Sequence, residues 1–299
     1  MKIPWAGDRC IICLLLKPFT VEHIIPESLG GKLTCSFLCR DCNSRLGAEI
    51  DHTAKTDPRI RQAAMALSST NPDLLRAIND GQIFNTNQGL QFKAKGGTLK
   101  VRPKKNADGS LIQANEDAKR TLARIMEKAG KSKAFVESRL EAYENAPAGI
   151  LIQLMPDLAV KKSKSAEINL FPGGDPMHST LLLKIAYEFI ALHLGNTIYH
   201  DDPPLVMLRA ALTDFKEPYP FVELYTAKQK RRGLFHGLAF EGNSPVARVQ
   251  IRLFETLAYR VNFPMLAVDG PRCGYHLDLA TGDERLMDLD KKLSYKFPA

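Results

Sequence analysis

Two pairs of cysteines near the start of the chain have the residue types and the spacing of a metal site. Each pair is a C-x2-C motif, and the four residues are Cys10, Cys13, Cys39 and Cys42. Four thiolates at about 2.3 Å can close a tetrahedral zinc site and leave no coordination position open, so this zinc would be structural. In a reducing compartment such pairs indicate a metal site before a disulfide. The sequence therefore predicts one structural zinc ion.

Between the cysteine pairs, an acidic residue precedes a histidine late in a predicted strand over residues 19–25. These residues are Glu22 and His23, and Pro26 ends the strand. An imidazole can take a proton from water near physiological pH, and a carboxylate is an oxygen ligand for Mg²⁺. Neighbouring side chains in a strand point to opposite faces, so we expect different roles for the two. A lone strand histidine is more often structural, but its place inside a zinc-bound loop favours catalysis.

Asn43 directly follows the last cysteine of the pairs, where a helix is expected to start. Asparagine is a good N-cap residue, and its amide oxygen is also a neutral ligand for a divalent ion. Both interpretations stay open at this point. Asp51 and His52 follow about two turns later, and we interpret them as surface groups, with a metal or phosphate contact as the alternative.

In order, these motifs read C-I-I-C, E-H-I-I-P-E-S-L-G-G and L-C-R-D-C-N-S-R-L-G. This arrangement, over roughly residues 8–52, closely resembles the HNH endonucleases, the ββα-metal nucleases, in their zinc-containing branch. The resemblance implies that His23 is the general base, that Glu22 and Asn43 hold a catalytic Mg²⁺ or Mn²⁺, and that the four cysteines hold the zinc. It further implies metal-assisted hydrolysis of a phosphodiester with a 5′-phosphate product.

One position departs from the family's pattern. The family has an asparagine five residues before the third cysteine, and it braces the loop that positions the base. This chain has Thr34 there. A threonine hydroxyl cannot make an amide's pair of hydrogen bonds, so the positioning of His23 is the part of the expected site that this departure affects.

The rest of the chain has the patterns of a mixed α+β protein. We predict a small zinc-containing ββα module over residues 1–55 and a larger α+β domain with antiparallel sheet over residues 56–299. Helices are expected over 59–79, 177–194 and 205–212, and a pair broken near Gly130 over 115–143. Strands are expected over 82–85, 90–94, 98–102, 149–155, 220–225, 234–240 and 246–261, the last with a break.

The charge of the chain favours a polyanionic partner. The formal net charge is +8, and residues 1–55 contribute only +1, from seven Lys or Arg and six Asp or Glu. We expect DNA as the partner and residues 56–299 as a DNA-recognition or sensor domain. The candidate DNA-binding residues are Arg45, Lys228, Lys230, Arg231, Arg232, Arg248 and Arg252, and a further basic run comprises Lys161, Lys162 and Lys164. Each run, taken singly, is at least as compatible with solvated loop ends.

Several classes are excluded or disfavoured. The chain contains no G-x-S-x-G elbow and no Walker A loop, so no rival hydrolase or NTPase motif is present. The start lacks a signal-peptide pattern, and the apolar stretch 180–194 carries Lys184 and Glu188 and falls short of a membrane span. We expect a cytoplasmic protein with no membrane partner.

Three functions stay open. The first is an HNH endonuclease of DNA in restriction, phage defence or mobile-element biology. The second is a zinc-containing nucleic-acid-binding protein that has lost nuclease activity, which only Thr34 favours. The third is a nuclease effector gated by a small molecule or a protein activator, which would be idle until that activator is added. A homo-oligomer is compatible with all three.

Overall fold

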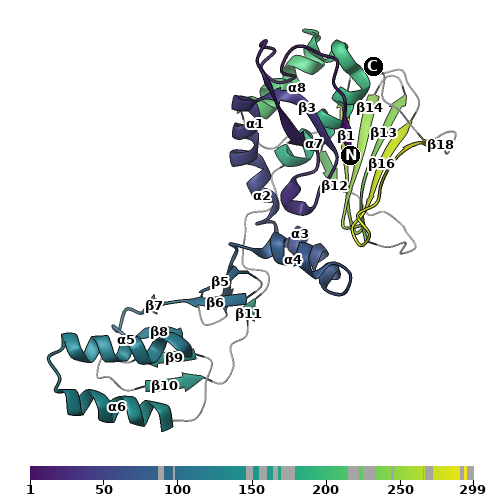
Figure 1. Ribbon diagram of the computed structural model, residues 1–299. Helices are drawn as coiled ribbons and strands as arrows, with labels where there is room; N and C mark the ends of the chain where they lie inside the picture. Colours follow the sequence, from purple (N-terminus) through teal and green to yellow (C-terminus); the bar gives the residue numbers. More distant parts are fainter. Residues whose placement is uncertain are drawn as a thin grey trace. The chain divides into compact units, whose positions relative to one another are not determined.

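The chain divides into two compact units. Unit 1 contains Met1–Ile78 and Gly173–Ala299, and unit 2 contains Asn79–Pro172. The computed structural model describes residues 1–86, 91–96, 98–145, 151–154, 160–163, 168–169, 179–214, 222–224, 234–243, 246–264, 266, 272–289 and 293–294. In sequence, unit 2 is therefore an insertion between two parts of unit 1 (Figure 1).

The N-terminal part of unit 1 is a small sheet followed by a helix. The sheet has the order β1-β3-β2, with β2 and β3 antiparallel and β1 parallel to β3. The strands are β1 (Lys2–Ile3), β2 (Phe19–His23) and β3 (Thr34–Cys39), and the loop between β2 and β3 contains the 3₁₀ turn η1 (Glu27–Leu29). The helix starts as α1 (Arg40–Leu46) and continues through a π-helical turn, η2 (Gly47–Asp51), into α2 (His52–Ala54). This order of elements is the predicted ββα arrangement.

Close packing of the loop explains the two consecutive glycines, Gly30 and Gly31, that follow η1. A Cβ atom on Gly31 would lie 1.9 Å from the carbonyl oxygen of Ile25, which is closer than any real contact. Gly30 has a φ of +87°, and a Cβ there would lie 2.8 Å from the Leu74 side chain. The pair is therefore required by close packing of the loop, in keeping with the absence of a phosphate-loop motif.

The C-terminal part of unit 1 is an antiparallel sheet of order β12-β15-β14-β13-β16-β17-β18 and two main helices. The helical elements are α7 (Ser179–Leu194), η4 (Gly195–Tyr199) and α8 (Pro203–Asp214). The strands are β12 (Val222–Leu224), β13 (Phe235–Asn243), β14 (Val246–Leu253), β15 (Leu257–Pro264), β16 (Cys273–Asp278), β17 (Glu284–Asp288) and β18 (Leu293–Ser294).

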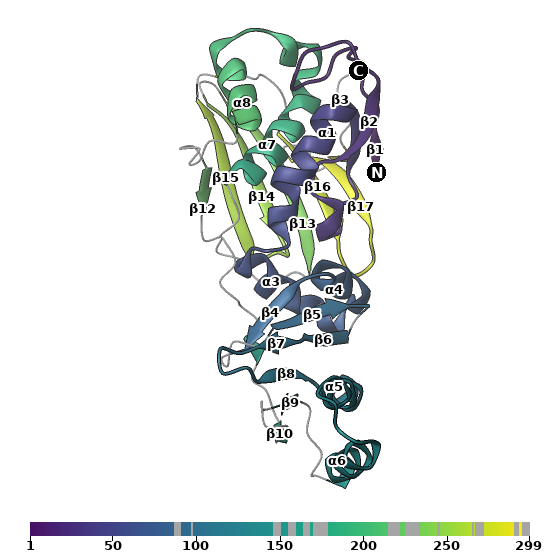
Figure 2. The ribbon, with the colours of Figure 1, turned by 90° about the vertical axis from the view of Figure 1, so that its left-hand side faces the viewer.

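Helix α7 forms the centre of unit 1. It contacts η2 on one side and β13, β14 and β15 on the other, so it lies between the ββα segment and the large sheet (Figures 1 and 2). Every residue from Thr180 to Leu192 is buried. One hydrophobic core runs through all three layers and includes Leu46 of α1, Ile185 of α7 and Val249 of β14. The ββα segment is thus packed into the C-terminal part of the chain.

This shared core changes the expected domain organisation. The boundary predicted between residues 55 and 56 does not separate compact units, because Pro58 starts α3 (Pro58–Ala64) instead of a linker. Asp57 caps that helix by accepting from the backbone N–H groups of Arg59 and Ile60 at 2.7 and 3.1 Å. Helix α3 then contacts β15, and the turn η3 (Met65–Ser69) and α4 (Pro72–Asn79) follow.

The described residues of unit 2 form two four-stranded sheets and two helices. The sheet orders are β11-β4-β5-β6 and β10-β9-β8-β7. The strands are β4 (Ile83–Thr86), β5 (Gln91–Lys95), β6 (Thr98–Arg102), β7 (Lys104–Lys105), β8 (Leu111–Ala114), β9 (Leu151–Leu154), β10 (Val160–Ser163) and β11 (Ile168–Asn169). The helices are α5 (Asn115–Lys128) and α6 (Lys133–Asn145). The predicted meander and the helix pair broken near Gly130 are confirmed.

By length and composition, the stretch Ser179–Tyr199 is apolar enough to cross a membrane. The predicted shortfall concerned residues 180–194 alone, and this longer stretch adds η4 to α7. However, 72% of its apolar window is buried inside the protein, as in the core helix of a compact fold.

Candidate functional site

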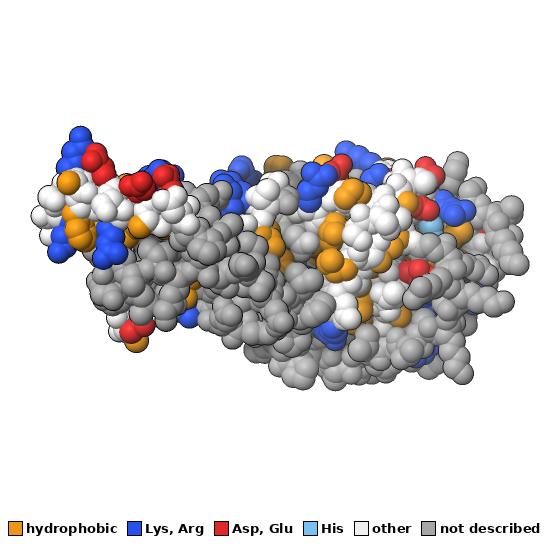
Figure 3. Space-filling model, turned by 90° about the horizontal axis from the view of Figure 1, so that it is seen from below, with side chains coloured by type: hydrophobic (Ala, Val, Ile, Leu, Met, Phe, Trp, Pro, Cys, Tyr) orange, Lys and Arg blue, Asp and Glu red, His pale blue; other side chains and the backbone are white. Residues whose placement is uncertain are grey.

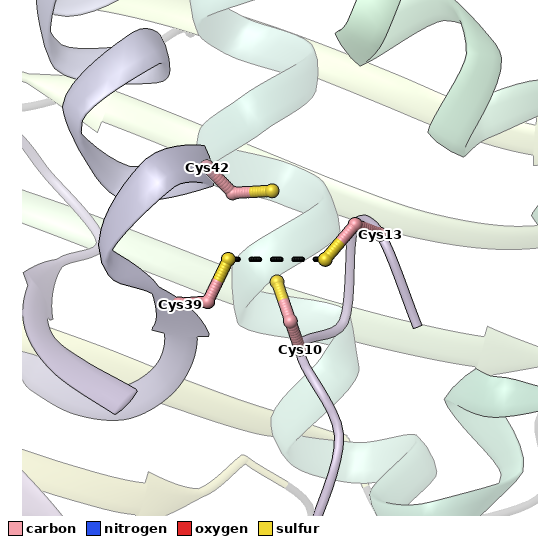
Figure 4. A group of neighbouring side chains, drawn as sticks. All are labelled: Cys10, Cys13, Cys39 and Cys42. Carbon is pink, nitrogen blue, oxygen red and sulfur yellow. Dashed lines mark hydrogen bonds between the residues drawn. The ribbon is translucent and has the colours of Figure 1, made fainter. Parts of the chain in front are cut away.

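The four cysteines predicted to bind zinc converge on one point. Their Sγ atoms all lie within 4.8 Å of one another, and those of Cys13 and Cys39 are 3.8 Å apart. Figure 4 shows the four sulfur atoms pointing toward one another. Four thiolates at about 2.3 Å from a zinc ion would lie about 3.8 Å apart in a regular tetrahedron. The cluster therefore fits a structural zinc ion.

Local structure explains why these cysteines meet. Cys10 and Cys13 lie in the loop before β2, Cys39 ends β3, and Cys42 is in the first turn of α1. A hydrogen bond with Cys42 lowers the pKa of the Cys10 thiol to about 5, and the same bond raises that of Cys42. Several thiolates this close repel one another, and a bound dication removes that repulsion.

His23 is the last residue of β2 and is half-buried. Its partner across the hairpin is Thr34, the position where the family pattern has asparagine. The Thr34 hydroxyl donates to the carbonyl oxygen of Met1 at 3.4 Å, so this side chain is directed to the N-terminus of the chain. Thr34 consequently does not supply the loop brace expected of an asparagine.

Asn43 lies inside α1, because the helix starts at Arg40 with Cys39 as its N-cap residue. The N-cap interpretation of Asn43 is therefore wrong. Its amide nitrogen donates to the hydroxyl of Thr20 and to the carbonyl oxygen of Val21, both at 2.9 Å. Asn43 thus ties the helix to the strand that ends in His23.

Glu22 is buried, with 4% of its surface exposed, and its carboxylate is paired with Lys184 of α7. Lys184 is fully buried, and its ammonium also lies 3.3 Å from Asp51 Oδ2 and 3.5 Å from Glu188 Oε2. The same ammonium donates to the carbonyl oxygen of His23 at 3.2 Å. We call Lys184, Glu22, Asp51 and Glu188 the Lys184 cluster.

Burial and charge act in opposite directions in this cluster. Burial raises the pKa of Glu22, although the charge of Lys184 lowers it. Burial also raises the pKa of Glu188 well above its ordinary value, and neither of its oxygens has a hydrogen-bond partner among the described residues. For Lys184 itself burial lowers the pKa, but the surrounding carboxylates outweigh that effect and raise it. The ammonium is therefore held in its charged form.

The Lys184 cluster corrects one expectation from the sequence and adds a partner to another residue. Asp51 is not a plain surface group, because its side chain is 20% exposed and faces Lys184. Glu22, expected to hold a divalent ion, has its carboxylate bound by Lys184 inside unit 1. The sequence did contain a signal: Lys184 and Glu188 are charged residues, four apart, in an otherwise apolar helix.

The candidate DNA-binding residues are only partly described. Arg248 and Arg252 alternate with buried residues of β14, as predicted, but Arg248 also pairs with Glu241 at 3.7 Å and with Asn262 at 3.0 Å. A cavity of about 260 Å³ on this sheet is lined in part by Arg252 and His276. Arg45 in α1 is half-buried. Lys228, Lys230, Arg231, Arg232 and Lys164 lie outside the described residues, as do the side chains of Lys161 and Lys162.

Basic and acidic side chains are mixed over the described surface (Figure 3). In the view of Figure 3, Lys and Arg side chains of the described residues form several separate groups, some beside Asp and Glu side chains. Mixed charge of this kind is also what solubility alone requires. The choice of DNA-binding residues therefore stays a prediction.

A second histidine connects the loop after His23 to the large sheet. His236 in β13 is fully buried, and its Nε2 donates to the carbonyl oxygen of Leu29 at 2.9 Å. Its Nδ1 accepts from the backbone N–H of Phe254 at 3.3 Å, so the neutral ring is the form that fits both bonds. Burial lowers the pKa of His236 from 6.5 to about 4.

This geometry predicts acid-induced loss of stability. A histidine whose pKa is lower in the folded state binds its proton only on unfolding, so stability is full above pH 6.5 and falls as the pH drops toward 4. The expected loss from His236 is about 3 kcal/mol across that window. Urea unfolding at pH 7 and pH 4.5 should show a smaller pH-dependence for His236→Gln than for the wild type. An equal pH-dependence in the two proteins would contradict the assignment.

The comparisons with known proteins agree with the geometry of the N-terminal segment. Residues 10–58 match the family model of the HNH endonucleases, which identifies this segment as an HNH module. The matched residues include all four clustered cysteines, Glu22, His23 and Asn43. No curated protein and no solved structure matches the chain.

Proposed function

We propose that this protein is an HNH-type endonuclease that hydrolyses phosphodiester bonds in DNA, with His23 as its general base. The observation that carries the proposal is the family match over residues 10–58, the segment in which the cysteine cluster and His23 also lie. The net charge of +8 favours a nucleic acid as substrate. Restriction, phage defence and mobile-element biology are the settings we propose, in the cytoplasm.

In the proposed reaction, the imidazole of His23 takes a proton from a water molecule. The resulting hydroxide attacks phosphorus in line with the 3′-oxygen, and the bond from phosphorus to that oxygen breaks. The released 3′-alkoxide takes a proton from water, and the other product carries a 5′-phosphate. The zinc site takes no part in the chemistry, because four cysteines leave no open coordination position. Its role is to hold the loop before β2 against the start of α1.

HNH nucleases are metal-dependent, and the expected ligands of the catalytic ion are Glu22 and Asn43. The residues as placed do not fit this pair, because the Glu22 carboxylate is buried and bound to Lys184. The amide nitrogen of Asn43 is bound to Thr20 and Val21, which leaves its amide oxygen as the atom that could ligate an ion. Glu22 is therefore the member of the expected pair whose placement does not fit a divalent ion.

Supercoiled plasmid tests the proposed function directly. We expect the zinc-loaded protein to convert supercoiled DNA to nicked or linear DNA with Mg²⁺ or Mn²⁺ and to leave it intact in EDTA. The same assay with a single-stranded RNA separates DNA cleavage from general nuclease activity. Absence of cleavage with either ion would contradict the proposal, and a lysate added to that reaction would then test for an activator.

A second candidate function is nucleic-acid binding without cleavage. One observation favours it: Lys184 binds the carboxylate that the family would use for the catalytic ion. In that case, plasmid would be retarded in a gel with a steep dependence on salt but never cut. A gated nuclease is compatible with the cavity beside Arg252, and it stays a prediction.

A further inference from the structure

We propose that the ammonium of Lys184 is the permanent cation of the Glu22 carboxylate, so that Glu22 does not ligate a catalytic divalent ion. The same ammonium holds the backbone at His23 and makes Lys184 a positioning residue for that histidine. This second part rests on the proposed function, whereas the first part holds for the protein whether or not it cleaves DNA.

The position of Lys184 in the fold makes the pairing permanent. Every residue of α7 from Thr180 to Leu192 is buried between the ββα segment and the sheet. The neighbouring Tyr187 donates its hydroxyl to the carbonyl oxygen of Ile11 at 2.8 Å, beside the cysteine cluster. Moving Lys184 away from Glu22 would therefore require opening the core of unit 1, not turning one side chain.

The surroundings of the ammonium are those of a cation site built by three elements. Glu22 comes from β2, Asp51 from η2, and Glu188 from α7 itself. All three direct carboxylate oxygens at one nitrogen atom, and the carbonyl oxygen of His23 is a fourth oxygen there. A dication on the Glu22 carboxylate would have to displace the Lys184 ammonium or lie next to it, and repulsion between the two cations opposes the second arrangement.

The bond to the His23 carbonyl oxygen links this cluster to the candidate base. His23 ends β2, and its backbone is held by pairing with Thr34 on one side and by Lys184 at 3.2 Å. Asn43 holds the same strand two residues earlier, at Val21. Because Thr34 does not supply the amide brace of the family pattern, Lys184 is the charged group that fixes where the His23 backbone lies.

The first experiment measures Mn²⁺ binding to the zinc-loaded protein by electron paramagnetic resonance, without DNA. We compare the wild type with Glu22→Gln and use Glu144→Gln, in the exposed Lys119–Glu144 pair, as the matched control. The proposal expects the Mn²⁺ dissociation constants of all three proteins to agree within about twofold, or binding to be undetectable in all three. A tenfold or greater weakening confined to Glu22→Gln would overturn it.

The second experiment is a thermal-unfolding cycle with Glu22→Gln, Lys184→Met and the double variant. Glu22→Gln removes one of the three carboxylates around the buried ammonium, and Lys184→Met leaves buried carboxylates without their cation. Each single variant is expected to lower the melting temperature by about 10 °C, whereas the double variant should lose less than the sum of the two. If Lys184→Met alone does not fold, folding of the double variant supports the pair. Additive losses, or an unchanged melting temperature in Glu22→Gln, would overturn it.

Cleavage kinetics test the role of Lys184 as a positioning residue for His23. We expect Lys184→Met to lower kcat at least tenfold with an unchanged KM, and Lys184→Arg to restore most of kcat because a guanidinium can bond the same oxygens. A higher KM with an unchanged kcat would contradict the positioning of His23 by Lys184. If the wild type does not cleave DNA at all, the proposed function fails, while the Mn²⁺ and unfolding experiments still decide whether Lys184 is the cation of Glu22.

Discussion

Replacing His23 with alanine is expected to lower DNA cleavage about 10³-fold, the usual contribution of a general base. The side chain is half-buried at the end of β2, and the structure records no side-chain hydrogen bond of His23 to another described residue. The truncation should therefore remove the proton acceptor and leave the fold intact. The measurement is the initial rate of plasmid cleavage, with zinc content and melting temperature determined on the same preparation.

A matched control for this variant is His200→Ala. His200 is also in unit 1, but its side chain is 61% exposed and lies far from His23 in the sequence. We expect it to keep the wild-type rate. Cleavage by His23→Ala at more than a tenth of the wild-type rate would show that His23 is not the base. Loss of zinc in that variant would show that its role is structural.

Replacing Cys39 with serine is expected to remove both the zinc ion and much of the stability of unit 1. Cys39 is 1% exposed, ends β3, and is the N-cap residue of α1, so a zinc ion bound by the cluster would join the strand, the helix and the loop of Cys10 and Cys13. Structural zinc contributes about 10–16 kcal/mol of binding free energy in small zinc domains. We expect the bound zinc to fall from one per chain to near zero and the melting temperature to fall by more than about 10 °C.

Cys35→Ser separates zinc loss from the effect of burying a hydroxyl. Cys35 lies in the same strand and is fully buried, but it is not a member of the cysteine cluster. This control should lose some stability and still bind one zinc ion per chain. Full zinc content in Cys39→Ser, measured by atomic emission, would contradict the four-cysteine site.

The Lys184 cluster bears on the choice between a nuclease and a protein that binds nucleic acid without cleaving it. If the Lys184 ammonium occupies the Glu22 carboxylate, a nuclease must hold its divalent ion with ligands other than Glu22. A protein that only binds nucleic acid needs no such ion. The two functions therefore differ in one result: cleavage that persists in Glu22→Gln, provided that the variant folds, supports a nuclease that does not use Glu22 as a ligand. Retardation of plasmid without cutting in the wild type supports binding alone.

Features of local spacing were predictable from the sequence. The two C-x2-C pairs, the strand that contains Glu22 and His23, and the alternation of Arg248 and Arg252 with apolar residues are patterns within a few residues of one another. The meander of unit 2 and helices α5, α6 and α7 were likewise predictable from turn residues and apolar periodicity. Such features can be predicted from the sequence because a turn, a strand or a metal-binding knuckle depends mainly on neighbouring residues.

The partner of Glu22 and the boundaries of the compact units were decided by the tertiary structure. Lys184 is 162 positions from Glu22, and in sequence it reads only as a charge in an apolar helix. The Leu29 carbonyl oxygen and His236, 207 positions apart, likewise meet only in the fold. No local sequence pattern predicts which distant residue pairs with a buried charged side chain. That partner follows from which helix the core buries against the ββα segment, since a buried carboxylate must be neutralised by whatever the packing brings to it.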